Sequence, residues 1–290
     1  MTTVQIAPPA APARPRPTPT VVAGIVMLGA VLLLAALPPL LPGFDPFAQD
    51  LAGAHAAPFE VAAHPLGTDA LGRDLLSRVS LATTVTLGMT AAIVAMNAVI
   101  GTAVGLLAGY FGGRVEAFVQ IVSNATLAMP VVLLLIAICA VLPPSAALTT
   151  VVLGATWWVG YARVTRNVAS ALRTRDFVVA PLTQGAGRVW VLTRHLLPNV
   201  WPHTLIIAAT DVATIILLES SLEYLGLGVQ PPVPSWGSMI FDGQKYLAAD
   251  PWLTMLPGIV MFLAVAGAQF LSQQFTAESR GALLRKGDMR

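Results

Sequence analysis

The chain has 290 residues, of which 56% are hydrophobic and only 10% are charged, and its formal net charge at pH 7 is +2. A soluble globule of this size needs far more polar surface than this composition supplies, so the composition predicts a membrane protein. The basic residues do not indicate nucleic-acid binding, because topology and anionic lipid account for lysines and arginines beside membrane spans.

The chain begins with a proline-rich stretch, residues 1–19, whose composition is typical of a disordered tail. The apolar run from Val21 to Leu41 follows two arginines, an order that resembles a secretory signal peptide. A cleaved signal has an apolar region of about 7–15 residues, and this run is longer. A retained membrane helix is therefore favoured over a cleaved signal.

Long apolar runs recur along the rest of the chain, and a helix needs roughly 20 such residues to span the hydrocarbon core. The runs lie at about 20–41, 82–109, 116–142, 146–162, 202–219 and 252–275. They predict an all-α membrane protein with six transmembrane helices and both termini on one side. If that side is the cytoplasm, only Arg73, Arg78 and Lys245 of the 16 lysines and arginines lie outside. The positive-inside rule thus predicts cytoplasmic termini.

One membrane domain accounts for nearly the whole chain. The predicted organisation is a disordered cytoplasmic tail at 1–19, a transmembrane domain at 20–275 and a cytoplasmic tail at 276–290. Two outer segments interrupt the domain, at 43–80 and at 220–251, and the second is rich in glycine, proline and aromatic residues, so we expect it to be folded. In the first, Thr68 or Asp69 is expected to cap a short helix.

The second predicted span carries glycines four residues apart, at Gly101, Gly105 and Gly109. This spacing leaves one face of a helix smooth enough for close packing against another helix. Packing within the same subunit is favoured over a contact between subunits.

No catalytic or nucleotide-binding motif is present in the sequence. It contains no G-x-x-x-x-G-K-[ST] phosphate loop and no G-x-S-x-G elbow, so any use of ATP must come from a partner. The single cysteine, Cys139, allows no disulfide within one chain, and the four histidines show no metal-binding spacing. The sequence therefore predicts a protein that is not an enzyme, and we assign it no metal ligand.

Two ionisable residues, Asp211 and Glu219, lie within the fifth predicted span. Charged groups at this depth are costly and avoid lipid, and on a helix these two lie about 80° apart. Both can face a bundle interior or a water-filled path, which makes them candidate pathway residues. In the alternative interpretation Glu219 reaches the outer interface and Asp211 binds a neighbouring backbone group.

The polar loop at 163–199 lies between the fourth and fifth spans and contains RDFVVAPLTQG. Asp176 suits a helix N-terminus, and Gly185 and Gly187 end or turn the element that follows. A second helical run, from Val189 to Leu197, precedes Pro198 and Asn199, and the asparagine is expected to cap the fifth span. A short helix of this kind can insert into a groove of a soluble partner or rest on anionic lipid.

This loop resembles the EAA loop of ABC importer permeases, whose pattern is Glu-Ala-Ala, three residues, Gly and, further on, an apolar residue followed by Pro. The matching positions are Val179, Ala180, Pro181, Gly185, Leu197 and Pro198. The glycine and the final pair are kept, whereas the acidic residue and the second alanine are not. LGTDALGRDLLSR at 66–78 and SLEYLGLGVQPPVPSWGSMI at 221–240 are similar to segments of the dipeptide, oligopeptide and nickel branch.

The resemblance, which covers about residues 64–262, implies a subunit of an ATP-driven importer in the bacterial inner membrane. Its partners would be a second permease, two cytoplasmic ATPases that bind ATP and Mg, and an extracytoplasmic binding protein. It implies that the loop docks on an ATPase and that docking drives alternating access. The residues expected to take part in coupling are Asp176, Phe177, Ala180, Gly185, Arg188 and Pro198.

Di- or oligopeptides are the expected substrates, with nickel or another small solute as the alternative. A different class of protein is also considered, an ion-coupled secondary transporter with Asp211 and Glu219 as its ion sites. A third interpretation, a membrane scaffold without transport, is disfavoured by the large folded outer segment and the docking loop.

Overall fold

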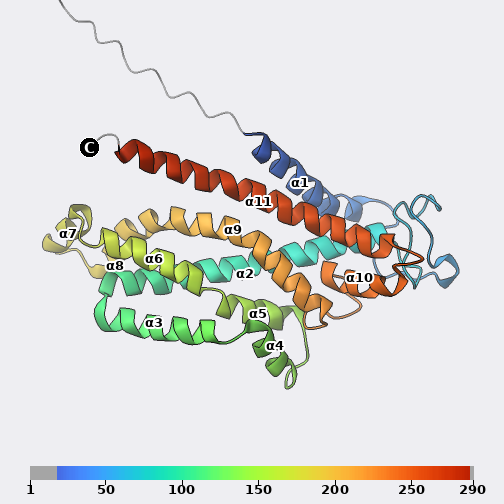
Figure 1. The fold of residues 1–290 in the computed structure, drawn as a ribbon, viewed down its shortest axis with the longest axis horizontal. Coiled ribbons are helices and arrows are strands. Elements are labelled where there is room, and N and C mark those ends of the chain that lie inside the picture. The colour runs from blue at the N-terminus through green and yellow to red at the C-terminus, as the bar shows by residue number, and fades with distance from the viewer. Residues whose placement is uncertain (1–17, 288–290) are drawn as a thin grey trace, which may run out of the picture.

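The computed structural model describes residues 18–287, and it describes side chains as far as residue 273. Within these residues the structure is all helical apart from two isolated β-bridges, as predicted (Figure 1). The helices are α1 (Pro19–Ala36), α2 (Leu75–Phe111), α3 (Gly113–Ala128), α4 (Val131–Cys139), α5 (Ala146–Thr156), α6 (Val159–Leu172), α7 (Asp176–Thr183), α8 (Arg188–Val191), α9 (Leu197–Tyr224), α10 (Trp236–Gly243) and α11 (Trp252–Gly287). Short 3-10 turns lie at Pro38–Leu40, Leu51–Gly53 and Gln244–Tyr246, and a π-helical turn lies at Leu192–Leu196.

Four of the described helices are long and apolar enough to cross a membrane. They are Pro19–Leu40, Leu75–Phe111, Arg188–Tyr224 and Trp252–Gln273. The pair α3 and α4 makes a fifth candidate, although it is bent by 74°. The bend falls at Pro130, whose ring and missing N–H prevent a regular helix from continuing through it. The predicted run at 116–142 is thus a broken pair of helices.

The predicted span at 146–162 is also divided into two helices, and neither of them is long and apolar enough to cross a membrane by itself. It forms α5 and the first residues of α6, separated at Trp157 and Trp158. The Trp158 side chain is buried in a cluster with Val159 and Ala162, and Ile100 and Val104 of α2 pack against this cluster. Hydropathy alone does not detect such a break, because both tryptophans are apolar.

The second predicted span begins earlier than its apolar run indicated, and the first outer segment is shorter accordingly. Helix α2 begins at Leu75, where Asp74 caps it by accepting a hydrogen bond from the Ser77 N–H at 2.8 Å. The expected short helix at Thr68 or Asp69 is not formed. Thr68 instead lies buried, and its hydroxyl donates to the Gly53 carbonyl at 2.6 Å, because the segment folds back on itself.

The glycine face of α2 packs against α6 within the same chain, as predicted. A Cβ atom added at Gly101 would lie 2.6 Å from the Trp158 carbonyl oxygen, and one at Gly109 would lie 2.6 Å from that of Arg166. Gly105 faces Ala162 and Thr165 in the same way. Only glycine permits this approach of the two backbones. Helix α2 is consequently the central element of the bundle (Figure 1).

Helices α1 and α11 lie side by side along one edge of the molecule (Figure 1). A Cβ atom at Gly24 of α1 would lie 3.0 Å from the Gly267 carbonyl of α11, so the two helices are in close contact. Residues 1–17 of the predicted tail lie outside the described residues. The predicted tail at 276–290 is helical as far as Gly287, because α11 continues without a break.

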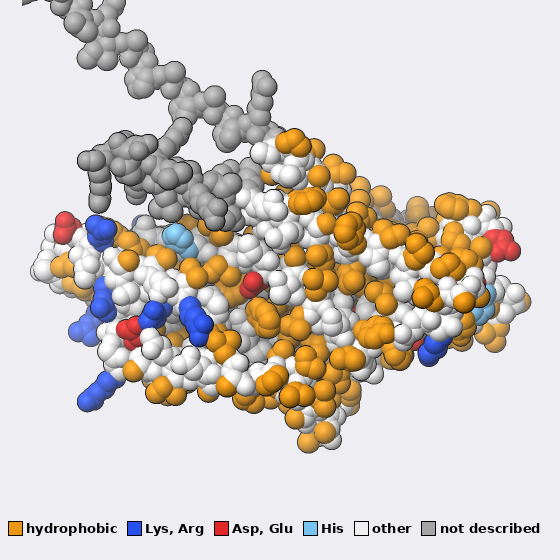
Figure 2. Space-filling model, viewed as in Figure 1, with side chains coloured by type: hydrophobic (Ala, Val, Ile, Leu, Met, Phe, Trp, Pro, Cys, Tyr) orange, Lys and Arg blue, Asp and Glu red, His pale blue; other side chains and the backbone are white. Residues whose placement is uncertain are grey.

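The two ends of the molecule differ in charge. Lys and Arg side chains gather at the end that carries α7, here called the α7 end (Figure 2). The opposite end, the α10 end, contains α10 and the segment before α2 (Figure 1). Between the two ends the visible surface is mainly apolar (Figure 2). This distribution is typical of a protein that spans a bilayer.

Candidate functional site

Helix α7 and the turns around it form the outermost part of the α7 end (Figure 1). Arg175 precedes the helix with extended backbone, and Asp176 is its first residue. A carboxylate in the first turn of a helix interacts favourably with the helix dipole. The prediction that a helix begins at Asp176 is confirmed.

One side of α7 is anchored in the bundle and the other is open. The Val178 side chain is fully buried in a cluster that includes Leu106 of α2, Val191 of α8 and Val200 of α9. Phe177 on α7 is 42% exposed. The residues exposed on this helix are Asp176, Phe177, Val179, Ala180 and Thr183. The buried side of α7 thus fixes this short helix to the bundle, and its exposed side presents an apolar and acidic surface.

Gly185 provides the turn after α7, as predicted. Its φ angle is +89°, a conformation that side chains other than glycine rarely adopt. The turn is closed by the Ala186 N–H, which donates to the Pro181 carbonyl at 2.9 Å. Gly187 then has extended backbone and precedes α8, which begins at Arg188. Gly185 therefore sets the direction in which α7 projects.

The boundary predicted at Pro198 and Asn199 is wrong. Residues Arg188–Tyr224 form one continuous helix, in which the π-helical turn at Leu192–Leu196 lies directly before Pro198. A proline cannot complete regular α-helical bonding to the preceding turn, and the wider π-turn accommodates it. Asn199 does not cap α9, because its Nδ2 donates back to the His195 carbonyl at 2.6 Å. Pro198 itself is exposed on the helix surface.

Both intramembrane carboxylates face the interior of the bundle. Glu219 is fully buried between α9 and α2, where its Oε1 accepts a hydrogen bond from the Thr90 hydroxyl at 2.6 Å. Asp211 is half-buried and lies near Tyr161 of α6. Glu219 therefore does not reach the outer interface as the alternative interpretation expected. The two carboxylates contact different helices and lie apart from α7.

Sequence reasoning missed Glu223, which lies one helical turn after Glu219. Its side chain is 2% exposed and lies beside Gly228 and Gly237, where a Cβ atom would crowd it. The signal was available, because residues four apart share one face of a helix. Buried ionisable groups in a membrane domain are rare, so a pair at this spacing is unusual.

Helix α2 meets α9 along a polar face that sequence reasoning also missed. Thr102 shares a hydrogen bond of 2.9 Å with Thr204 of α9, and Thr90 donates one of 2.6 Å to Glu219 of α9. Thr83 accepts a hydrogen bond of 3.2 Å from the indole of Trp236 on α10. The buried polar side chains along this part of α2 include Thr83, Thr86, Thr90, Asn97 and Thr102. The first four follow the helical period and mark one face of α2 that is shielded from lipid, whereas Thr102 lies on another side of the helix.

No described group of three or more histidine, cysteine or carboxylate side chains is placed to hold a metal ion.

The fold and the site define a polytopic membrane protein with a short anchored helix at a basic end and a polar interior between α2 and α9. Comparison with known proteins agrees with this class and identifies the family. Residues 101–276 match the family model described as the inner membrane component of binding-protein-dependent transport systems. The chain belongs to this family.

Curated relatives extend the match over most of the chain. The nickel transport system permease protein NikC of Escherichia coli (strain K12) is 35% identical over 77% of this chain and 79% of its own length. The probable D,D-dipeptide transport system permease protein DdpC of the same strain is 32% identical, over 86% and 83%. The oligopeptide transport system permease protein OppC of Haemophilus influenzae is 30% identical, over 86% and 80%. The protein is therefore a permease subunit of an ABC importer.

A solved structure agrees with the fold. A chain of the MetNI methionine ABC transporter, in an inward-facing conformation, matches with a TM-score of 0.52 and 20% identity. The match covers 69% of this chain and 95% of that one. The family match and the curated relatives disfavour the interpretations of an ion-coupled secondary transporter and of a scaffold without transport.

Proposed function

We propose that this chain forms half of the translocation pathway of an ATP-driven importer for di- or oligopeptides in the bacterial inner membrane. Its partners are a second permease, two cytoplasmic ATPases that bind ATP and Mg, and an extracytoplasmic binding protein that delivers the substrate. This chain supplies no ATP hydrolysis. Its relatives include peptide permeases, and the two segments at 66–78 and 221–240 support the same branch.

The observation that carries the proposal is the geometry of α7. Its base is fixed by buried Val178, and it exposes Asp176, Phe177 and Ala180 at the basic end. An apolar helix face of this size fits a groove in a soluble protein. Because the helix is packed on α2 and α9, a movement of the ATPase is transmitted to the bundle as a rigid-body displacement. Arg188 and Pro198 lie on the continuous helix that carries this movement.

The proposed topology has six spans and places both termini in the cytoplasm. The spans are α1, α2, α3 with α4, α5 with α6, the helix that ends in α9, and α11. The basic residues at the α7 end support this orientation through the positive-inside rule. The α10 end then faces the binding protein.

Labelling of cysteines tests the orientation. In a Cys139→Ser background, Leu51→Cys is placed at the α10 end and Val189→Cys at the α7 end, and the native side chains are 71% and 73% exposed. A membrane-impermeant maleimide added to intact spheroplasts should label Leu51→Cys alone, and lysis should expose the other site. Labelling of Val189→Cys before lysis would reverse the topology.

The experiment that tests the proposed function is purification of the tagged chain from native membranes, followed by transport assays on the recovered complex. A second permease and P-loop ATPases should co-purify. Reconstituted with its binding protein, the complex should take up a radiolabelled dipeptide only when ATP is supplied. Recovery of the chain alone under mild detergent would contradict the proposal.

Nickel is the second candidate substrate, and the 35% identity to NikC favours it. The same proteoliposomes distinguish the two, because radiolabelled nickel and a labelled dipeptide can be offered in parallel and in competition. We expect uptake of the dipeptide that nickel does not inhibit. Uptake of nickel alone would replace the peptide assignment but leave the importer assignment intact.

We also propose that Asp211 faces the translocation path, whereas Glu219 joins α9 to α2. Asp211 retains partial exposure beside Tyr161, and Glu219 has none. Asp211→Asn is therefore expected to change transport without changing assembly, and the labelled-dipeptide assay measures it. Equal uptake by Asp211→Asn and the unmodified chain would remove Asp211 from the path.

A further inference from the structure

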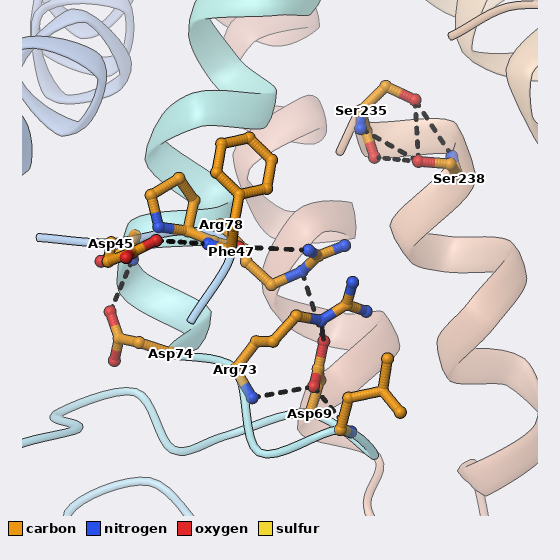
Figure 3. Close-up of polar contacts among 11 residues, drawn as sticks. Asp45, Phe47, Asp69, Arg73, Asp74, Arg78, Ser235 and Ser238 are labelled. Carbon is orange, nitrogen blue, oxygen red and sulfur yellow. Dashed lines mark hydrogen bonds and ion pairs between the residues drawn. The ribbon is translucent and has the colours of Figure 1, made fainter. Parts of the chain in front are cut away.

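A cavity of about 220 Å³ lies at the α10 end, between the start of α2, the segment before it and α10. Its charged and polar walls are formed by Asp69, Arg73, Arg78, Asp242, Lys245 and Tyr246. Figure 3 shows Arg73 and Arg78 reaching toward the same carboxylate, that of Asp69, from one side. The lining thus contains more cations than carboxylates.

The carboxylate of Asp69 is fully used by its neighbours. Its Oδ2 pairs with the Nε of Arg73 at 2.7 Å and with the Nε of Arg78 at 3.3 Å. Its Oδ1 accepts the backbone N–H groups of Leu71 and Arg73 at 2.9 and 3.0 Å. One negative charge therefore serves two guanidinium groups, so it does not neutralise both.

The guanidinium groups keep several donors that no described partner occupies. Among the described residues, Arg73 uses only its Nε in side-chain bonding, and Arg78 adds a long contact of 3.4 Å from Nη1 to the Pro46 carbonyl. Arg78 is only 5% exposed. A buried cation is costly unless an anion pairs with it, and a guanidinium offers a planar fork that fits an oxyanion.

The other charges around the cavity do not remove this excess. Asp242 on α10 makes no ion pair within 4.0 Å among the described residues, and its carboxylate acts on Arg78 from a greater distance. The wall then holds two carboxylates, Asp69 and Asp242, against its cations. Lys245 lies over the ring of Phe241, with its Nζ 5.4 Å from the ring centre. It therefore adds a third positive charge to the wall.

We propose that this cavity binds a small oxyanion, a carboxylate or a phosphate, through the free donors of Arg73 and Arg78, with Lys245 at the rim. Two sources offer this chemistry, a soluble solute and the phosphate of a lipid headgroup. Leu71 in the wall is 39% exposed, and Leu247, beside Tyr246, is 54% exposed, so apolar surface adjoins the charged wall. The proposal does not depend on which substrate the importer carries.

The test uses the complex purified through a tag on this chain, in a maltoside detergent that carries no anionic group. Binding of radiolabelled inorganic phosphate is measured by equilibrium dialysis, with chloride keeping the ionic strength constant. Saturable binding is expected for the unmodified chain. Arg73→Gln should weaken it about tenfold or more, because it removes a charge-assisted fork.

Two further variants separate a specific site from general electrostatics. Arg73→Lys keeps the charge without the fork and should give intermediate affinity. Arg163→Gln is the matched control, since it removes one arginine at the far end, where its Nη2 contacts Asn124 at 3.4 Å. If Arg73→Gln fails to assemble, Lys245→Gln replaces it, with a smaller loss expected.

The two sources are distinguished by adding short-chain phosphatidylglycerol to the micelles. If the natural occupant is a headgroup, this lipid should compete with phosphate in the unmodified chain and lose that effect in Arg73→Gln. If phosphate binding is unaffected, the occupant is a soluble anion. Absence of saturable phosphate binding, or equal affinity in Arg73→Gln and Arg163→Gln, would overturn the proposal.

Discussion

The α7 end and the α10 end are held in place by different interactions. Val178 and half-buried Leu182 anchor α7 by apolar contacts, and most of the other residues of that helix are exposed. The α10 end is held by polar contacts between side chains, among them the ion pair of Asp69 with Arg73 and the hydrogen bond of His55 with Asp250 at 2.6 Å. A capping box at Ser235 begins α10. The polar and apolar groups of α7 are thus largely left open to the surface, whereas those of the α10 end are used within the fold.

The capping box illustrates how tightly the α10 end is bonded. The Ser235 hydroxyl accepts the Ser238 N–H at 3.2 Å, and the Ser238 hydroxyl accepts the Ser235 N–H at 3.0 Å (Figure 3). Trp236 follows directly and is fully buried. Such reciprocal bonding fixes the entry of a helix and contributes about 0.5–2 kcal/mol.

The largest expected effect comes from Gly105→Leu, which acts on the scaffold between the two ends. The added Cβ would lie 2.8 Å from that of Thr165 and 2.9 Å from the Ala162 Cα, and the rest of the leucine would collide with α6. Overpacking of this kind costs about 3 kcal/mol or more where backbone blocks relief. Thermal unfolding of the detergent-solubilised complex measures the loss.

The matched control is Gly88→Leu on the same helix, where nothing lies within 4 Å of an added Cβ. It should leave the unfolding temperature nearly unchanged. If the two variants were equally stable, close packing of α2 on α6 would not link the two ends.

A smaller loss is expected for Glu219→Leu, which acts at the polar contact between α2 and α9. The change removes the acceptor for the Thr90 hydroxyl and leaves a buried polar group unpaired, at a cost of about 1–3 kcal/mol. Glu219→Gln keeps an acceptor of the same shape and should be nearly neutral. The unfolding temperatures of the two variants, measured side by side, test this expectation. An equal loss of stability in both variants would assign the effect to the charge of Glu219.

Gly185→Val tests the α7 end, where the effect should appear in transport and not in assembly. A β-branched residue at φ +89° is strained by about 1–3 kcal/mol, so the turn is expected to relax and re-aim α7. ATP-driven uptake should fall to near background while the amount of complex stays constant.

Gly187→Val is the control for this turn. Both glycines have open space around an added Cβ, but Gly187 has a φ angle of −69° that valine accepts. Uptake by Gly187→Val should therefore be largely retained. Normal uptake by Gly185→Val would count against the docking role of α7.

The smallest effect is expected at the α10 end, from Asp74→Ala. The change removes the N-cap of α2 and the contact with His64 at 3.1 Å, at a cost of about 1 kcal/mol. Asp74→Ser restores the cap without the contact to His64 and should recover most of that loss. If serine restores nothing, the His64 contact and not the cap holds the start of α2.

Sequence reasoning was most successful where the signal is local. The start of α7 at Asp176 and the turn at Gly185 follow from the dipole and from a positive φ angle, both properties of a few neighbouring residues. It failed at Asn199, where a residue suited to a cap lies inside a continuous helix. Capping preference is a weak signal, and the packing of Val200 and Leu196 in the core outweighs it.

The sequence by itself determined the class of this protein: an apolar chain with too little polar surface for water must lie in a bilayer, and its basic residues and family segments identify an importer permease. Tertiary structure alone decided which polar groups meet. Thr83 with Trp236 and Thr90 with Glu219 pair across elements far apart in the chain. Their partners depend on how the helices pack, and no periodicity within one helix contains that information.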